Sequence, residues 1–254
     1  MKSLQAFLKK ETLEVWKNYH LIILLSLFTA LGILSVFTAK FTPELISQLV
    51  SPEIAKALPE PTLVDSWLQF YKNVSQIGLF VVVILFSSSL TNEYQKGTLT
   101  ILVTKGLPRW TVVTSKLLVS LAVFTTAFGL GAIITYLYSL FYFKGQSLSH
   151  VGWFLFLLWL FSLFMIVMLF FASVVCRNTY SVLLMLGSLV ILLLLVSWLK
   201  VCQPYNPLQL FSQSTGLLTK DLVLKDFIKS IAVTSGLSLL MFISSLILFN
   251  RKSL

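Results

Sequence analysis

The chain has 254 residues; 57% of them are hydrophobic, only 11% are charged, and the mean hydropathy is +0.91. Soluble domains carry about 25% charged residues, so the composition excludes an ordinary soluble domain and indicates a membrane protein. The formal net charge of +10 is typical of a membrane protein whose Lys and Arg side chains face the cytosol and anionic lipid. No basic run with interleaved aromatic residues points to nucleic-acid binding.

The first segment, residues 1–18, is predicted to be an amphipathic helix that lies in the membrane interface. Apolar residues recur in it at helical spacing, with lysines elsewhere on the helix; they are Leu4, Phe7, Leu8, Val15 and Trp16. Trp16 and Tyr19 are of the types that collect at membrane–water boundaries. They favour an interfacial helix over the alternative, a frayed basic tail.

Six apolar runs follow, each near the roughly 20 residues that a bilayer requires. We therefore predict an all-α membrane protein that forms a single transmembrane domain over residues 1–254. Cys176 and Cys202 lie at opposite ends of one span, too far apart for a disulfide. The expected spans, of which the second is the shortest, are Tyr19–Ala39, Val74–Thr91, Leu117–Phe143, Val151–Cys176, Tyr180–Leu199 and Ser230–Asn250.

The distribution of Lys and Arg between the loops predicts the orientation of the chain. The side with more of them contains the N-terminal segment, the loop at residues 92–116, Arg177, and the pair Arg251 and Lys252. By the positive-inside rule, both termini and the 92–116 loop should be cytosolic in a multi-pass protein of the plasma (inner) membrane.

Two loops on the opposite side are predicted to contain short helices. In the first, Thr42-Pro43-Glu44 and Ser51-Pro52-Glu53 each read as an N-cap residue, a proline at the first helical position and an acid. In the second, residues 200–229, Asn206-Pro207 predicts a helix start and Gly216 a helix stop. That segment is apolar but too short to span, which favours a re-entrant or interfacial helix over a surface hairpin.

The chemistry missing from the sequence narrows the function. None of the six predicted spans contains Asp, Glu, Lys or Arg in its interior, and ion-coupled carriers need ionisable groups at membrane depth. There is no GxxxxGK[ST] motif for a nucleotide. His20 and His150 stand alone at membrane edges, without a metal-ligand pattern. We therefore expect no catalytic residue, cofactor or metal in this chain.

Small polar residues within the spans are candidates for lining a pathway between helices. For each single residue a packing role is favoured over a role in the pathway, because small residues let helices approach closely. The candidates are Ser87, Ser88, Thr125, Thr126 and Ser173.

The loop Asn92–Lys116 is the longest polar segment on the predicted cytosolic side. After the pair Gly97-Thr98, the residues Leu99, Leu102 and Val103 would form one apolar stripe of a short helix. The same stretch also alternates as a strand would, so the pattern alone leaves both open.

Two turn residues end this apolar run. Gly106 and Pro108 stop one element and start the next, with Pro108 at the first position of the long third helix. A push on the short element would therefore tilt the third span. A bundle without internal energy coupling needs such a push from a soluble partner if it is to pump.

At these residues the chain resembles the membrane subunits of ABC-2 type exporters. The similarity lies in Glu93-x-x-x-Gly97-Thr98, the apolar run that follows, Pro108-Arg109-Trp110, and Lys116. The overall layout is similar too, with a basic amphipathic N-terminal helix, six spans, and short outer helices before the last span. The first outer loop, which contains four prolines, is longer than expected for the smallest members of that family.

The resemblance implies a cytosolic coupling helix seated on a separate P-loop ATPase subunit, which would bind the ATP and Mg. It also implies two membrane subunits, as a homodimer or with a related chain. Glu93 would brace the coupling helix by pairing with Arg109 or Lys96; the alternative is a solvated acid, since exposed pairs contribute little. The implied ATPase-coupling residues are Glu93, Gly97, Thr98, Leu99, Leu102, Val103, Pro108 and Arg109.

The uncharged, aromatic-rich spans favour a lipophilic or amphipathic cargo, such as a peptide or toxin, a drug or a lipid-linked molecule, over an ion. Two other classes stay open. One is a non-pumping immunity or sensor protein that binds a toxin or partner, and the other is a secondary carrier or channel. Co-purification with a P-loop subunit, or transport without ATP, would distinguish them.

Overall fold

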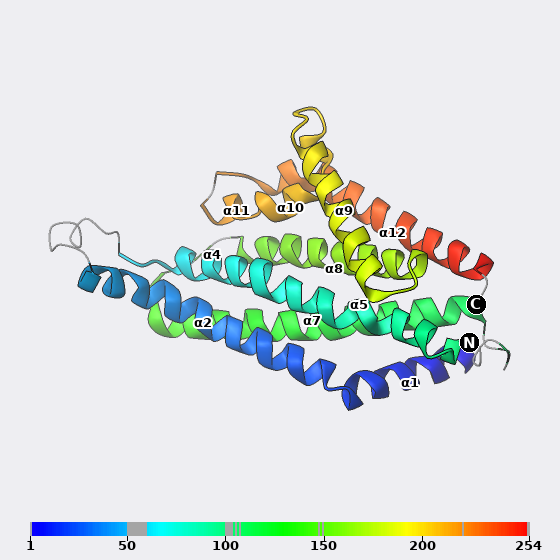
Figure 1. The fold of residues 1–254 in the computed structure, drawn as a ribbon. Helices are drawn as coiled ribbons and strands as arrows, with labels where there is room; N and C mark the ends of the chain where they lie inside the picture. Colours follow the sequence, from blue (N-terminus) through cyan, green and yellow to red (C-terminus); the bar gives the residue numbers. More distant parts are fainter. Residues whose placement is uncertain are drawn as a thin grey trace.

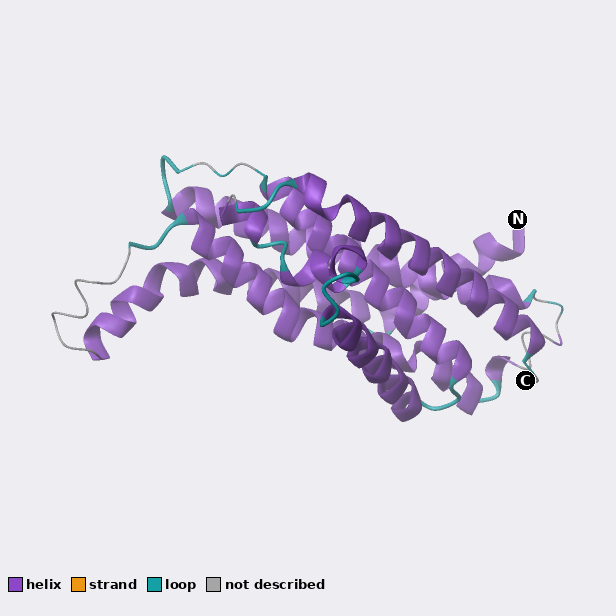
Figure 2. Cartoon of the chain, turned by 90° about the horizontal axis from the view of Figure 1, so that it is seen from above, coloured by secondary structure: helices purple, strands orange, loops and turns teal. Residues whose placement is uncertain are grey.

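The computed structural model describes residues 2–49, 60–99, 104, 106, 108–146, 148, 150–219 and 221–252. Within these ranges every regular element is helical and no strand occurs (Figure 2). The prediction of an all-α protein with six membrane-spanning helices is confirmed for the described residues. The six stretches that are long and apolar enough to cross a membrane are His20–Thr42, Leu63–Gln95, Arg109–Tyr142, Val151–Val175, Thr179–Ser197 and Leu224–Arg251.

The described residues form the following helices and helical turns. In chain order they are α1 (Lys2–Lys17), α2 (His20–Leu49), α4 (Leu63–Asn73), the π-helical turn η1 (Val74–Gly78), α5 (Leu79–Gln95), α7 (Arg109–Tyr142), α8 (Val151–Val175), α9 (Thr179–Ser197), η2 (Gln203–Tyr205), α10 (Leu208–Ser212), α11 (Gly216–Thr219), η3 (Leu224–Phe227) and α12 (Ile228–Arg251).

The second span is longer than predicted. The elements α4, η1 and α5 run on without a break as a stretch of 33 residues, whereas the shortest span is α9 with 19 residues. The sequence pattern located only the uniformly apolar half of this stretch. The half before Val74 is amphipathic, because it buries Trp67 and Phe70 on one face and leaves Asp65 and Gln69 half-buried and Lys72 exposed on the other.

The helices lie lengthwise in an elongated bundle, from which α9 leans outward (Figure 1). The helix α1, the end of α5, the start of α7 and the end of α12 meet at one end, which we call the coupling end. The described residues nearest the two termini lie there together (Figure 1). The far end of α2 and the short helices α10 and α11 lie toward the opposite end (Figure 1).

Aromatic side chains fill the core between α2, α4, α7 and α8. The ring of Phe28 packs edge-on against Phe124, with centroids 5.8 Å apart, and Phe70 packs against Phe128 at 5.9 Å. Such pairs contribute about 0.5–1.5 kcal/mol each beyond their buried area. These rings fix the spacing of α2, α4 and α7.

The helices α2 and α7 touch backbone to backbone at two glycines. A Cβ atom on Gly131 would lie 2.8 Å from the carbonyl oxygen of Phe28, and one on Gly32 would lie 2.7 Å from the carbonyl oxygen of Gly131. The hydroxyl of Thr135 donates to the Gly131 oxygen at 2.9 Å and to the Gly32 oxygen at 3.4 Å. Here small residues serve close helix packing.

The helix start predicted at Thr42-Pro43-Glu44 is wrong. The helix α2 continues through these residues to Leu49, and the hydroxyl of Thr42 donates back to the carbonyl of Thr38 at 2.5 Å. A helix already formed by the long apolar run can pass through a proline if it gives up one backbone hydrogen bond. The second proposed start, Ser51-Pro52-Glu53, lies outside the described residues.

The helix stop predicted at Gly216 is also wrong. The helix α10 begins at Leu208, directly after Asn206-Pro207 as predicted, but it ends at Ser212. Gly216 instead begins α11. A Cβ atom at this position would lie 2.7 Å from the side chain of Leu222, so a larger residue would require that side chain to shift.

The segment before α12 packs onto the bundle as an ordered cap. The side-chain amide of Asn206 donates to the carbonyl of Leu193 in α9 at 2.8 Å, and the hydroxyl of Ser230 donates to the carbonyl of Pro204 at 2.8 Å. Apolar side chains of the short helices, including Leu210, are fully buried. The segment is therefore held to both α9 and α12.

Candidate functional site

Glu93 lies near the end of α5 and turns inward at the coupling end, where only 7% of its surface is exposed. One carboxylate oxygen, Oε1, lies 2.8 Å from the Nζ of Lys10 in α1 and 3.1 Å from the Nζ of Lys116 in α7. The pairing predicted with Arg109 or Lys96 is therefore wrong. Lys96 is exposed beyond the last residue of α5, and Arg109 binds the end of α12, as described below.

Lys116 is the most deeply buried cation in the described part of the chain, with 2% of its surface exposed. Its ammonium lies 2.9 Å from Oε2 of Glu11 and 3.1 Å from Glu93. Removing an ion from water is expensive, so a buried ammonium is stable only when carboxylates surround it. Lys116 thereby joins α7 to both α1 and α5.

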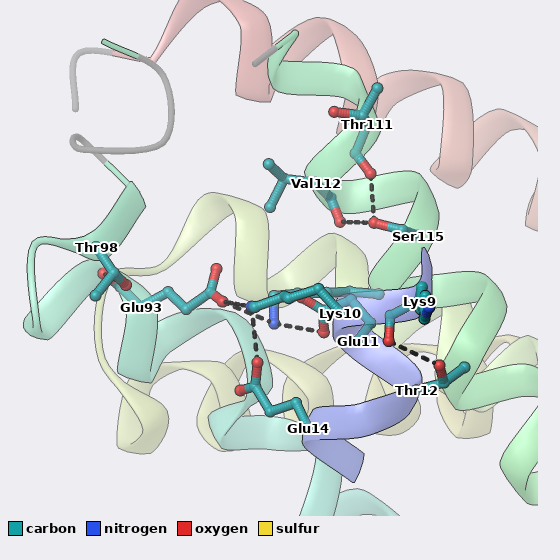
Figure 3. A network of polar contacts seen from close by, with 11 residues as sticks. Lys9, Lys10, Glu11, Thr12, Glu14, Glu93, Thr98, Thr111, Val112 and Ser115 are labelled. Atoms are coloured by element: carbon teal, nitrogen blue, oxygen red, sulfur yellow. Dashed lines mark hydrogen bonds and ion pairs between the residues drawn. The ribbon is translucent and has the colours of Figure 1, made fainter. Parts of the chain in front are cut away.

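Lys10 completes the arrangement from α1. Its ammonium contacts Glu11 at 2.8 Å, Glu14 at 2.7 Å and Glu93 at 2.8 Å, and Figure 3 shows it among these three carboxylates. Burial alone would lower the pKa of Lys10, but its hydrogen bonds to the three acids outweigh that effect and raise the pKa above its ordinary value. We call the five residues Lys10, Glu11, Glu14, Glu93 and Lys116 the ion-pair cluster.

The sequence pattern did not reveal this cluster, although a signal was present. The predicted interfacial helix has its apolar face in the membrane and its lysines elsewhere, whereas Lys10 of α1 contacts Glu93 of α5. Glu11 and Glu14 are the first acids in the chain and stand three residues apart within a basic segment, which places them on adjacent positions of one helix face. The face of α1 that carries Phe7 and Glu11 is buried, while Trp16 is exposed.

The three acids of the cluster could in principle hold a cation. Ligand atoms of Glu11, Glu14 and Glu93 lie within 4.8 Å of one another. The ammonium of Lys10 already contacts all three carboxylates. The arrangement is therefore suited to holding helices together, with a lysine in the place that a metal ion would take.

The chain leaves α5 through a glycine turn. Gly97 has a φ of +67°, a conformation that side chains other than glycine rarely adopt. Its backbone amide donates to the carbonyl of Tyr94 at 3.2 Å, and the hydroxyl of Thr98 donates to the carbonyl of Glu93 at 3.3 Å. After this turn the chain returns to the bundle, where the side chain of Leu99 is buried.

Leu99 is 1% exposed and belongs to a small apolar core at the coupling end. We call this core the end cluster. It draws one or more residues from each of α1, α5, α7, α8 and α12, and its members are Phe7, Leu90, Leu99, Val112, Val113, Val174 and Phe249. A displacement of Leu99 would therefore disturb a core that five helices share.

The remaining coupling candidates fall on both sides of an undescribed stretch. Thr98, Leu99 and Thr104 have helical geometry, but Leu102 and Val103 lie outside the described residues, so the helical stripe stays a prediction. Pro108 is the N-cap residue of α7, one position before the predicted one, and its carbonyl accepts a hydrogen bond from the Thr111 amide at 3.0 Å.

Arg109, the first residue of α7, contacts the end of α12. Its Nη1 donates to the carbonyl of Asn250 at 3.2 Å and to the carbonyl of Lys252 at 2.5 Å. The last carbonyls of a helix have no partner within the helix, so they readily accept a guanidinium. The start of α7 is thereby fixed to the end of α12.

A cleft of about 700 Å³ opens beside the ion-pair cluster. It lies between α1 and α5, and its lining mixes charged and small polar side chains, including Glu14, Asn18, Ser88, Asn92 and Lys96. One of the five predicted pathway residues, Ser88, lines this cleft.

The other four pathway candidates make contacts within the bundle. The hydroxyls of Ser87, Thr126 and Ser173 donate to carbonyls of their own helices at 2.8 Å. The hydroxyl of Thr125 accepts a hydrogen bond from the indole of Trp159 at 3.1 Å. These contacts agree with packing roles, and a role in lining a pathway stays a prediction.

The chain also matches a known protein family. The family model described as ABC-2 type transporter matches residues 2–198 of the chain, a range that includes the ion-pair cluster and the whole 92–116 segment. No curated protein matches the chain.

Proposed function

Because the chain belongs to the ABC-2 type transporter family, we propose that it is the membrane subunit of an exporter whose ATPase pushes on residues 92–116. The family is the membrane component of ABC transporters; it is not itself catalytic, and the ATPase is a separate protein. The chain is accordingly a multi-pass permease subunit that works with an ATPase partner.

One observation carries the proposal of a coupling role for residues 92–116. Leu99 enters the end cluster, while Glu93, six residues earlier, is bound into the ion-pair cluster. Both ends of the Glu93–Leu99 stretch are thus anchored in the bundle, one by charge and one by apolar packing. Movement imposed on the exposed part of the segment would be transmitted to α1, α5 and α7 rather than absorbed by a loose loop.

The distribution of basic residues supports a cytosolic location for this segment. The basic residues that predict the cytosolic side are gathered at the coupling end: Lys10 contacts Glu93, Arg109 contacts the end of α12, and Lys252 contacts the end of α8. This grouping agrees with the positive-inside rule and with an ATPase that binds from the cytosol of a cell whose plasma (inner) membrane holds the chain.

The cargo we propose is lipophilic or amphipathic, with a basic or amphipathic peptide as first choice. A groove of about 500 Å³ between α5, α8, α9 and α10 supports it. Apolar side chains such as Phe80, Phe161, Leu194 and Phe211 line most of it, and a few polar groups such as Ser212 lie at its edge. An ion would find no charged partner among these residues.

A second membrane subunit completes the pathway in this proposal. In the 18-residue apolar stretch of each of the spans formed by α9 and by α12, only 11% of the residues are buried within the chain. Their outward apolar side chains are available to lipid or to a second subunit, either a copy of this chain or a related one.

The proposal is tested by reconstituting the chain with the ATPase subunit that co-purifies with it. We expect Glu93→Ala to insert in the membrane and bind the ATPase normally. The complex that contains this variant should hydrolyse ATP. Inside-out vesicles with that complex should take up several-fold less of a fluorescent amphipathic peptide for each ATP hydrolysed. The matched control is Glu60→Ala, which removes an exposed acid far along the chain from the segment.

Two results would overturn the proposal. If no P-loop ATPase co-purifies with the wild-type chain, a non-pumping role is favoured. If Glu93→Ala transports as much peptide per ATP as Glu60→Ala, then Glu93 and the ion-pair cluster have no part in coupling.

A further inference from the structure

The last residues of α12 and Lys252, which follows the helix, connect three other helices at the coupling end. The carbonyls of Asn250 and Lys252 accept hydrogen bonds from Arg109, the first residue of α7. The side chain of Lys252 extends in another direction, toward the end of α8. A stretch of three residues thus touches the beginning of one span and the end of another.

The ammonium of Lys252 caps α8. It donates to the carbonyl oxygens of Val174 at 2.5 Å, Val175 at 3.2 Å and Cys176 at 3.4 Å. These carbonyls belong to the last turn of α8, where no backbone amide is available to them. A cation is also favoured there by the negative end of the helix dipole.

The same ammonium contacts α5. It lies 4.6 Å from the centre of the Tyr94 ring, within the range of a cation–π contact. Tyr94 in turn packs edge-on against Phe249 of α12, with centroids 6.1 Å apart. The contacts of one side chain therefore reach α5 and α8, while its own backbone holds Arg109 of α7.

We propose that Lys252 is a positioning residue that fastens the ends of α8 and α12 to the start of α7, so that movement of the 92–116 segment reaches all three helices together. Arg109 belongs to the 92–116 segment and lies seven residues before Lys116, its last residue. Through Arg109 the segment contacts the backbone of Lys252. The inference rests on the proposed function for its purpose, but the fastening itself can be measured without any transport assay.

The native cysteines provide that measurement. Cys176 lies at the end of α8, directly under Lys252, and Cys202 lies beyond the opposite end of α9; both are free thiols. We expect Lys252→Met to raise the alkylation rate of Cys176 on the order of fivefold, because the last turn of α8 opens more often. The rate at Cys202, followed in the same sample by mass spectrometry, should not change.

Two further variants control for side effects. Arg251→Met removes the exposed neighbouring cation and should leave Cys176 at the wild-type rate. Lys252→Arg keeps a cationic donor and should restore much of the protection that Lys252→Met loses. Unchanged alkylation of Cys176 in Lys252→Met would overturn the proposal, and so would an equal rise at Cys202, which would signify loosening of the whole bundle.

A transport experiment then separates this inference from the proposed function. In inside-out vesicles with the co-purifying ATPase and the fluorescent amphipathic peptide, Lys252→Met should lower peptide uptake per ATP by several-fold, and Arg251→Met should not. Normal uptake per ATP in Lys252→Met would overturn the positioning role but leave the exporter intact. Absence of ATP-dependent uptake in the wild-type chain would overturn the proposed function, and the positioning role with it.

Discussion

Lys116 of α7 and Glu11 of α1 form an ion pair of 2.9 Å in which the two side chains are only 1% and 4% exposed. The residues are 105 positions apart in the chain, and the contact holds the first helix of the protein against the longest span. Because little water reaches either charge, the loss of Lys116 would leave Glu11 and Glu93 with only the half-exposed Lys10 as their cationic partner. The pair therefore contributes to the stability of the coupling end.

We expect Lys116→Met to lower the free energy of unfolding by up to about 3–5 kcal/mol, the usual cost of removing one partner of a buried pair. The double variant Lys116→Met/Glu11→Leu should recover part of the loss, because it also removes one of the two carboxylates that Lys116 contacts. Unfolding in mild detergent, titrated with a denaturing detergent, measures both. The control Lys225→Met, at an exposed lysine before α12, should change stability by less than about 0.5 kcal/mol. A similar small value for Lys116→Met would contradict the importance of the pair.

The docking of α1 should depend on pH in a defined window. Burial alone would raise the pKa of Glu14, but its hydrogen bond to Lys10 and the charge of Lys116 outweigh this and lower it below its ordinary value. Its contribution to docking is therefore present above the ordinary pKa of about 4.3 and is lost as pH falls through the lower folded value. The raised pKa of Lys10 works the other way, so its contribution is lost only as pH rises beyond about 10.4.

Fluorescence energy transfer between labels on α1 and α7 measures this docking. The signal should be flat between about pH 5 and 10 and should fall at both extremes. In Lys10→Met the acid limb should shrink, because Glu14 has lost its first partner. An acid limb of unchanged size in that variant would show that other groups control the docking.

Gly131→Ala should weaken the contact between α2 and α7. The added methyl would meet the Phe28 backbone oxygen at 2.8 Å, so the helices must separate, at a cost of about 1–3 kcal/mol. Gly129→Ala is the matched control: it lies in the same helix, two residues earlier, with open space around its Cβ position. That change should be neutral or stabilising by up to about 1 kcal/mol. Equal thermal stability of the two variants would contradict the close approach of the helices.

Gly97→Ala should disturb the glycine turn after α5 through the backbone alone. No atom lies within 4 Å of the Cβ position, but the φ of +67° costs an alanine about 1–2 kcal/mol. Gly97→Asn should be milder, because asparagine tolerates this conformation better. We expect peptide transport per ATP to fall in the order glycine, asparagine, alanine. The reverse order for the two variants would contradict the role assigned to the turn.

The sequence predicted the spans because long apolar runs leave few alternatives to membrane helices. It could not predict the partner of Glu93, because Lys10 and Lys116 become neighbours only when α1, α5 and α7 pack. The predicted partners, Arg109 and Lys96, are closer to Glu93 along the chain. In the structure Arg109 contacts the end of α12 and Lys96 is exposed.

The same contrast explains the errors at Pro43 and Gly216. Both residue types commonly mark helix boundaries, and the neighbouring sequence at each position predicts such a boundary. The continuous helix before Pro43 and the Leu222 side chain beside Gly216 decide the outcome, and neither is visible in a short window of sequence. The preceding helix at Pro43 and the contact with Leu222 at Gly216, rather than turn chemistry alone, matter at these two places.

The central claim is that the segment at residues 92–116 lies in the cytosol and binds the ATPase. Its most direct test is the labelling of Lys96→Cys, an exposed position at the end of α5, with a membrane-impermeant maleimide after both native cysteines are changed to serine. We predict labelling in inside-out vesicles stripped of the ATPase, protection when the ATPase is added back, and none in intact cells. Labelling in intact cells, or labelling that the ATPase does not reduce, would contradict the account.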